Sequence, residues 1–458
     1  TVLEDWAGNN LFESNEIEKE RGVVLEELRL GQGAGQRLRD KYFPKLLQGS
    51  QYVNRLPIGK KDILQTFKRQ SLVDFYETWY RPDLMAVVVV GDIDVNEIEA
   101  KIKAQFSPIK AKRKIIPRPD FPIPDTKGTA VAIETDKEAT NANAQVLYKK
   151  PKETLNTLAD LRSQTIQEIF DDMMGYRLDE IRQSPNPPFI SAFAGFGSLF
   201  RNKGSYTLAA ATSALSIKPT LSLLLLENKR VKEFGFTASE FEREKQRFLA
   251  DLENYYKERD KLESGYLTSQ YVDHFLNKSP ITGVEFDFNF VKSILPSITL
   301  EEVNALAKST ISEDNRVVII TGQEKEGLIY PTESEVLALL KDSETAKVTP
   351  YTETVTNGEL VNNLPANAKI SEEKTDNKFG ITYLTLSNGV RIALKSTDFQ
   401  ADEILMTGFS PGGLSLMGNE KVLSGSYFSQ VVSESGVGKF SKVELGKMLA
   451  GKKANVSI

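Results

Sequence analysis

An acidic, helix-forming stretch occurs twice in this chain, and the repetition limits how the chain can fold. Residues 16–27 align with residues 240–251, which lie 224 positions further on. A β-branched run follows in both copies, at 87–90 and again at 317–320. Acidic amphipathic helices can resemble one another by chance, but matched features that recur in the same order favour a duplication. The sequence therefore predicts repeated domains.

Two shifts in composition divide the chain into three segments. Residues 107–127 are rich in proline, which cannot continue a helix or a central strand, and they predict an extended linker. Residues 347–377 are rich in Thr, Asn, Glu and Lys, which is typical of a strap between domains. We therefore expect the C-terminal half of a first domain at 1–106, a complete second domain at 128–346 and the N-terminal half of a third domain at 378–458.

The hydrophobic patterns predict helices and mostly antiparallel strands in uneven alternation, which favours an α+β fold over a doubly wound parallel sheet. Helices are expected at residues 16–30, 62–80, 95–106, 155–182, 218–233, 238–272, 299–310 and 420–433. Strands are expected at 87–90, 129–134, 144–149, 190–196, 204–212, 316–321, 381–386, 390–395 and 403–408. The run at 87–90 is of the kind buried on both faces of a sheet. Asn388-Gly389, between two of the strands, predicts a β-hairpin.

Composition restricts the class of protein. The net charge is −5 with both signs mixed along the chain, which argues against a nucleic-acid partner. The longest apolar runs, at 84–90 and 221–226, fall short of the ~18 residues of a membrane helix, so no membrane insertion is expected. Cysteine is absent, which excludes disulfides and cysteine-bound metals. A chain without cysteine or a visible signal peptide would suit a bacterial periplasm or a cytoplasm.

Carboxylates gather on one side of the first acidic helix. Glu16, Glu20 and Glu27 would lie within about 40° of one another around an α-helix. Such a stripe is usually a solvated face, but it is also a plausible half of a metal site. The chain has one histidine, His274, which we expect on the surface. The remaining ligands of a zinc site are therefore not in this sequence.

Several of these stretches together resemble a known family. Residues 20–27, then Pro57-Ile58-Gly59, then residues 74–92 closely resemble the M16 zinc metallopeptidases (pitrilysin- and insulinase-like, or inverzincins). Residues 383–392 look like the opening strands of an M16 domain. The resemblance implies repeated α+β domains, peptide substrates, Zn²⁺ as the cofactor, and contacts with the remaining M16 domains of the same protein.

The resemblance also implies roles for two glutamates. M16 enzymes bind zinc through an H-x-x-E-H motif on one helix and a glutamate further along the chain. Glu27 is implied as that zinc ligand, and Glu20 as the carboxylate behind it that orients a ligating histidine. This chain has no H-x-x-E-H motif, so the general base is expected upstream of residue 1. The chain alone is expected to be inactive and to bind zinc poorly.

The later segments do not supply a second zinc site. Tyr427, Gln430 and Val431 stand where the third segment would need its two histidines and its glutamate. Asp251 occupies the position of Glu27 in the second domain and has no visible partner ligands. Two functions remain open: an M16 zinc endopeptidase, or a non-catalytic M16 homologue that serves as a scaffold or peptide-binding subunit. An H-x-x-E-H motif within the ~80 residues upstream would favour the first.

Overall fold

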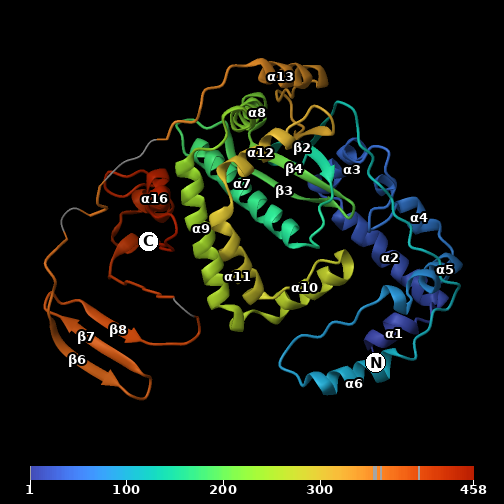
Figure 1. Cartoon of the computed structure of the whole chain (residues 1–458), viewed down its shortest axis with the longest axis horizontal. Helices are drawn as coiled ribbons and strands as arrows, with labels where there is room; N and C mark the ends of the chain where they lie inside the picture. Colours follow the sequence, from blue (N-terminus) through green and yellow to red (C-terminus); the bar gives the residue numbers. More distant parts are fainter. Residues whose placement is uncertain (1, 354–357, 362–363, 401–402) are drawn as a thin grey trace. The chain divides into compact units, whose positions relative to one another are not determined.

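The computed structural model describes residues 2–353, 358–361, 364–400 and 403–458 (Figure 1). The chain divides into two compact units. The first contains residues 1–241, 263–282 and 294–351, and the second contains residues 242–262, 283–293 and 352–458. Helices alternate with mainly antiparallel strands in both, so the predicted α+β class is confirmed.

A five-stranded sheet lies at the centre of the first unit, in the order β1-β5-β2-β4-β3. Its strands are β1 (Thr129–Asp136), β2 (Ala142–Pro151), β3 (Phe189–Phe200), β4 (Lys203–Thr212) and β5 (Arg316–Gln323). β1 and β5 pair in parallel, whereas the other neighbours are antiparallel. All five strands were predicted from the sequence, and each extends beyond its predicted range.

Helices from the same segment cover one face of this sheet. They are α7 (Leu158–Arg182), α8 (Ile217–Phe234), α12 (Leu300–Thr310) and α13 (Glu333–Thr345). α7, α12 and α13 each begin with a capping box, in which a threonine and an acidic residue satisfy free backbone N–H groups. Stacked Tyr148 and Tyr206 lie on this face, and Phe170 of α7 packs edge-on against Tyr206.

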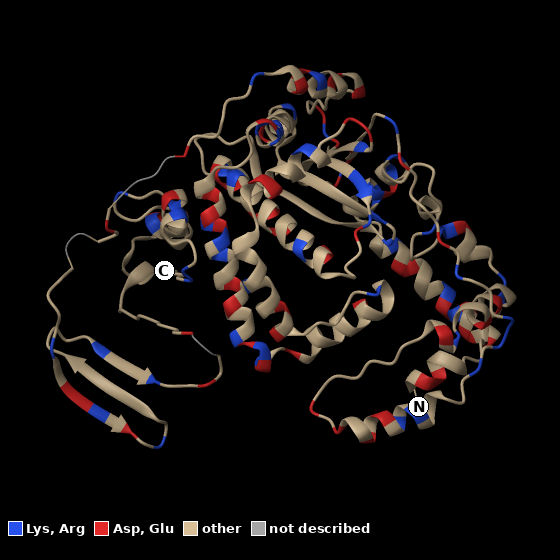
Figure 2. Ribbon diagram, viewed as in Figure 1, with Lys and Arg blue, Asp and Glu red and all other residues tan. Residues whose placement is uncertain are grey.

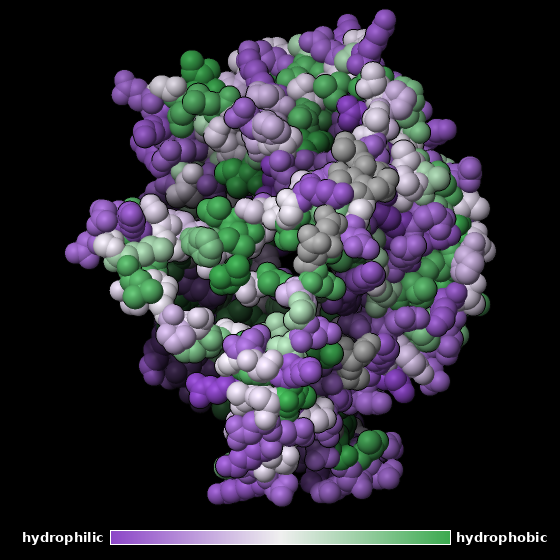
Figure 3. Space-filling view, turned by 90° about the vertical axis from the view of Figure 1, so that its left-hand side faces the viewer, coloured by the Kyte–Doolittle hydropathy of each residue, from purple (hydrophilic) through white to green (hydrophobic). Residues whose placement is uncertain are grey.

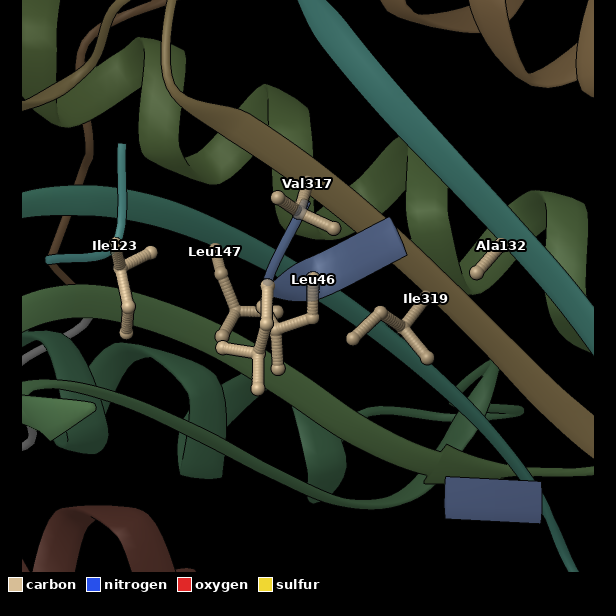
Figure 4. Packing of buried hydrophobic residues seen from close by; sticks show 7 residues of the cluster. Leu46, Ile123, Ala132, Leu147, Val317 and Ile319 are labelled. Atoms are coloured by element: carbon tan, nitrogen blue, oxygen red, sulfur yellow. The ribbon is translucent and has the colours of Figure 1, made fainter. Parts of the chain in front are cut away.

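The opposite face is covered by α3 (Ala34–Leu46), a helix from the first segment that the sequence did not predict. Side chains alternate between the faces of a strand, so Leu147 points away from Tyr148 and toward α3. The core on this side is apolar and comes from widely separated parts of the chain: Leu46, Leu47, Ile123, Ala132, Leu147, Val317 and Ile319 (Figure 4). Ile123 belongs to the proline-rich stretch, which therefore packs against the sheet.

The remaining helices of the first segment are α1 (Val2–Gly8), α2 (Ser14–Gly31), α4 (Lys61–Thr66), α5 (Arg69–Trp79) and α6 (Val95–Phe106). The helix predicted at 16–30 is confirmed as α2. The single helix predicted at 62–80 is wrong, because Phe67 and Lys68 are extended and separate α4 from α5. Arg21 donates hydrogen bonds to the carbonyl oxygens of Leu64 and Phe67, so these C-terminal carbonyls of α4 are satisfied without a continuing helix.

The strand predicted at 87–90 is also wrong. These residues belong to no helix or ladder among the described residues, and Val87 and Val89 are 37% and 46% exposed. A β-branched run favours a strand only where a neighbouring strand can pair with it. No strand in the described part of the chain pairs with this run.

The long helix predicted at 238–272 is three elements. They are α9 (Ala238–Lys257), a short 3₁₀ turn at Arg259–Lys261 and α10 (Ser264–Asn277). The Arg259 guanidinium lies 4.2 Å from the Tyr256 ring centroid and donates to the Tyr256 carbonyl oxygen, which satisfies a free carbonyl where α9 ends. α11 (Val284–Ile294) follows and was not predicted.

The third segment, in the second unit, contains an antiparallel sheet in the order β6-β7-β8. The strands are β6 (Ile370–Asp376), β7 (Ile381–Leu386) and β8 (Arg391–Lys395). The hairpin predicted at Asn388-Gly389 is confirmed, with Gly389 at φ 88°. β6 lies inside the stretch predicted as a strap, so 347–377 is not wholly linker.

The rest of the third segment is less regular than predicted. Residues 403–408 form no strand, and 401–402 lie outside the described residues. The helix predicted at 420–433 is broken into a 3₁₀ turn (Asn419–Lys421), α14 (Val422–Ser426) and α15 (Phe428–Ser433). Ser424-Gly425-Ser426 precedes the break, and these residues have low helix propensity. α16 (Lys442–Met448) follows. Among the described helices, none is long and apolar enough to cross a membrane.

Candidate functional site

α2 carries the two glutamates that the sequence singles out, and Arg21 fixes the position of this helix. The Arg21 guanidinium lies 4.0 Å from the centroid of the Phe67 ring and donates to the Phe67 carbonyl oxygen over 3.0 Å. Ile17 is buried on the same helix. α2 is therefore attached to the start of the α4–α5 pair, while its acidic positions stay free of that contact.

Most of the charges on α2 are paired along the helix (Figure 2). Glu16 binds Lys19 at 2.6 Å, Glu18 binds Arg21 at 2.9 Å and Glu26 binds Arg29 at 2.5 Å. Residues three positions apart are neighbours on a helix, so these ion pairs are local. Hydrogen bonds from Arg21 and Arg29 lower the pKa of Glu18 and of Glu26, respectively.

Glu20 and Glu27 differ from these carboxylates. Both are exposed, and neither has a hydrogen bond or ion pair with any described residue of the chain. Seven residues correspond to about 700° of rotation, so the two side chains leave α2 in nearly the same direction. Their backbone positions are roughly 10.5 Å apart along the axis. Glu20 and Glu27 thus form an open acidic face, with two carboxylates too far apart to hold one ion together.

The residues of this chain do not by themselves fit a zinc ion. A catalytic zinc takes three protein ligands at about 2.0–2.3 Å. Among the described residues, no group of three or more His, Cys, Asp or Glu side chains is arranged to hold a metal. Glu27 has the right chemistry for one carboxylate ligand. The histidines that would complete such a site are not in this sequence.

The other residues considered from the sequence have structural surroundings. His274 is exposed at the surface, as predicted, and its Nδ1 lies 2.6 Å from the Ser279 carbonyl oxygen. Asp251 forms an ion pair with Lys453 at 2.7 Å. Tyr427 separates α14 from α15, and Val431 is 62% exposed. None of these residues approaches a second candidate ligand within the described chain.

A cavity of about 280 Å³ in the first unit was not predicted from the sequence. It lies between the N-terminal half of α7 and the ends of β2, β3 and β4, and its charged and aromatic lining includes Lys150, Glu153, Glu168, Asp171 and Phe196. The Lys150 ammonium lies 4.5 Å from the Phe196 ring centroid, and burial lowers its pKa. The signal that could have indicated it is the spacing of Glu168, Asp171 and Asp172, which share one side of α7.

Asp171 is the most perturbed group in this cavity's lining. Its Oδ2 accepts a hydrogen bond from the Phe196 backbone N–H at 2.8 Å, while its buried Oδ1 has no hydrogen-bond partner. Burial raises the pKa of Asp171 to about 8, and the neighbouring carboxylates of Asp172, Glu168 and Glu153 add to the shift. Asp171 is therefore largely protonated at neutral pH.

Comparisons with known proteins agree with the resemblance seen in the sequence. The family model for the peptidase M16 inactive domain matches residues 66–248. A zinc protease PQQL-like protein from Arabidopsis thaliana is 28% identical over 98% of this chain and 44% of its own length. The probable zinc protease PqqL of Escherichia coli is 27% identical over 100% of this chain and 49% of its own length. The chain thus spans about half the length of these relatives.

Solved structures show the same fold. The crystal structure of the periplasmic protease PqqL from Escherichia coli matches with a TM-score of 0.72 at 24% identity, over 98% of this chain and 50% of that one. The first half of the same protease, solved separately, matches with a TM-score of 0.71 over 77% of this chain and 75% of that one.

Proposed function

We propose that this chain, which belongs to the M16 peptidase family, is part of a zinc-dependent endopeptidase that hydrolyses peptides. In this proposal residues 1–106 and 378–458 are partial M16 domains on either side of a complete, non-catalytic domain at 128–346. Glu27 supplies one zinc ligand and Glu20 orients a ligating histidine. The histidines and the general base come from residues outside these 458.

The observation that supports the proposal is the state of Glu20 and Glu27. They share one face of α2, and both lack a partner among the described residues, whereas Glu16, Glu18 and Glu26 on the same helix are all paired. A purely solvated face gives no reason for the unpaired carboxylates to recur after seven residues. A carboxylate kept free of local cations is available to a metal that arrives with its other ligands from elsewhere.

The substrate class follows from the same family membership. The relatives are named zinc proteases, and one fold neighbour is described as a ferredoxin protease in complex with Arabidopsis ferredoxin. We propose polypeptides bound in extended form as the substrates of the longer protein, because an exposed sheet edge can add a strand from a peptide.

The test uses the longer polypeptide that contains these residues. Glu27→Gln keeps the size and removes the charge, and it is expected to abolish bound zinc and peptide hydrolysis. Glu20→Gln is expected to weaken zinc affinity by about 10- to 100-fold, as loss of an orienting partner does. Zinc content by mass spectrometry and cleavage of an unfolded protein substrate are the two measurements.

Glu26→Gln is the matched control, because it makes the same change one position away at a residue already paired with Arg29. It is expected to leave zinc content and cleavage unchanged. Full zinc stoichiometry in Glu27→Gln would contradict the assignment of the ligand.

A non-catalytic M16 scaffold is the second candidate. It is favoured by the match to a domain described as inactive and by the lack of a three-ligand group among the described residues. The two functions differ in the sequence immediately upstream. A polypeptide with no H-x-x-E-H motif there, and with no chelator-sensitive cleavage, would be the scaffold.

A further inference from the structure

The extended run Ala86–Val90 presents strand-forming side chains and backbone groups that pair with nothing in the described structure. Its valines are β-branched, a composition enriched in strands. Val87 and Val89 point to one face and are both exposed, as alternation along a strand requires. An unpaired strand of this kind is a template for another chain.

The second copy of the repeat shows what this run would pair with. The elements α2, α3, α4, α5, the run at 86–90 and α6 recur in the same order as α9, α10, α11, α12, β5 and α13. Adding 231 to the residue numbers places α5 on α12 at both ends and Gly91 on Gly322. The run at 86–90 then falls on residues 317–321 of β5.

β5 is a central strand. It pairs in parallel with β1 on one side and antiparallel with β2 on the other, and Val317, Val318 and Ile320 are fully buried. The equivalent run at 86–90 therefore lacks two partners, one like β1 and one like β2.

The third segment offers such a pair of strands. Thr397-Asp398 repeats Thr135-Asp136 at the end of β1, and Pro411 repeats Pro151 at the end of β2. These matches place β8 on β1 and residues 404–409 on the second half of β2. β8 pairs with β7 on one side and with no described strand on the other. Residues 404–409 belong to no described ladder.

The side chains of this second run are unusually exposed for their chemistry. Ile404, Leu405 and Met406 are 95%, 84% and 92% exposed, although apolar residues in a strand normally face a core on at least one side. Figure 3 looks toward the side of the molecule that is on the left in Figure 1 and shows apolar side chains at the surface among polar ones. Burying such groups contributes roughly 25 cal/mol per Å² of apolar surface.

We propose that two copies of this chain associate head to tail, with residues 86–90 of one copy added between β8 and residues 404–407 of the other. The pairings of β5 fix the register. Val88 would lie opposite Leu405 in the antiparallel pair and beside Leu394 in the parallel pair, as Ile319 lies between Gln145 and Ala132. The proposal goes beyond the peptidase function and does not depend on zinc.

A second copy is the occupant because each chain carries both complementary halves. The association is heterologous, since different surfaces meet, so it can continue from copy to copy into rings or open chains. The expected particle is therefore larger than 51.1 kDa, and its mass rises with protein concentration.

The test is the mass of the purified chain, measured by light scattering after gel filtration over a range of concentrations. Val88→Pro removes a backbone donor from the inserted strand, and Leu405→Pro does the same in the receiving pair. Each variant alone is expected to be a monomer. An equimolar mixture is expected to form a dimer and nothing larger, because each variant keeps the half that the other has lost.

Ile116→Pro is the control, since this residue is exposed, lies in the proline-rich stretch and has no ladder to lose. It is expected to associate as the unmodified chain does. Hydrogen exchange of the unmodified chain gives a measurement that needs no variant: amides at 86–90 and 404–407 should become at least 10-fold more protected as concentration rises, a change of about 1.4 kcal/mol.

Three results would overturn the proposal. The first is a monomer at every concentration with no change in exchange at either run. The second is association that Leu405→Pro leaves intact, which would indicate pairing between two copies of the 86–90 run. The third is a mixture of the two variants that stays monomeric.

Discussion

Asp171 illustrates at the scale of one residue how burial changes a side chain. Its carboxyl group lies between α7 and β3, with one oxygen bonded to the Phe196 N–H and the other unpaired. The sequence around it is an ordinary helical stretch, so nothing there indicates that β3 removes this group from water. Glu20 and Glu27 are the opposite case, because their type and spacing alone were enough to single them out.

The raised pKa of Asp171 predicts a pH-dependent contribution to stability. With a pKa of about 8 in the folded chain and about 3.9 when unfolded, Asp171 keeps its proton on folding between these pH values. Its contribution is full below about pH 4 and is lost as the pH rises to about 8. Asp171→Asn, which cannot ionise, should therefore gain stability relative to the unmodified chain as the pH rises from 5 to ~8.

Urea unfolding at the two pH values measures this difference. Asp260→Asn is the control, because that side chain is 82% exposed and should give the same difference at both. Parallel pH profiles for Asp171→Asn and the unmodified chain would refute the prediction.

At the scale of elements, the sequence patterns predicted type better than partner. The five strands of the first unit were found because alternation and β-branched residues are local properties, and the same properties mark 87–90, which nevertheless forms no ladder. The helix predicted at 62–80 kept its apolar spacing but is broken at Phe67, where Arg21 takes the carbonyls. α3 was missed, although it covers one face of the sheet.

The packing of α3 gives a prediction for this element. Leu47 follows α3 directly and is fully buried beside Val317 and Ile319 in the core of the first unit. Leu47→Ala removes apolar contacts and leaves a cavity, so it should lower the free energy of unfolding by about 2 to 5 kcal/mol. Leu11→Ala, at a side chain that is 75% exposed, should change it by less than about 0.5 kcal/mol.

Chemical denaturation followed by circular dichroism measures both variants. Equal stabilities for Leu47→Ala and Leu11→Ala would mean that α3 is not held against the sheet in solution.

At the scale of the whole molecule, the chain spans about half of its relatives and carries one of the groups that a zinc site needs. A zinc ion held by a single carboxylate is weakly bound, because catalytic zinc uses three protein ligands. Head-to-tail association does not alter this, since each copy adds one histidine and no cysteine.

The purified 458-residue chain is therefore expected to retain no stoichiometric zinc after dialysis and to show no chelator-sensitive cleavage of an unfolded protein. Zinc content by mass spectrometry and a protease assay with and without a chelator test this. The Glu27→Gln form of the same chain should be indistinguishable from it in both measurements. Stoichiometric zinc that disappears in Glu27→Gln would show that this chain completes the site by itself.

The sequence by itself determined the α+β class, the strands of the first unit, the M16 resemblance and the two glutamates of α2. These follow from local periodicity, residue type and spacing, which are present before the chain folds. Only the tertiary structure decided that α3 and Ile123 complete a core under the sheet, that Asp171 is buried beside β3, and that 86–90 has no neighbour. Each of these depends on contacts between residues distant in the sequence, and such contacts fix burial, pairing and pKa only when the chain is folded.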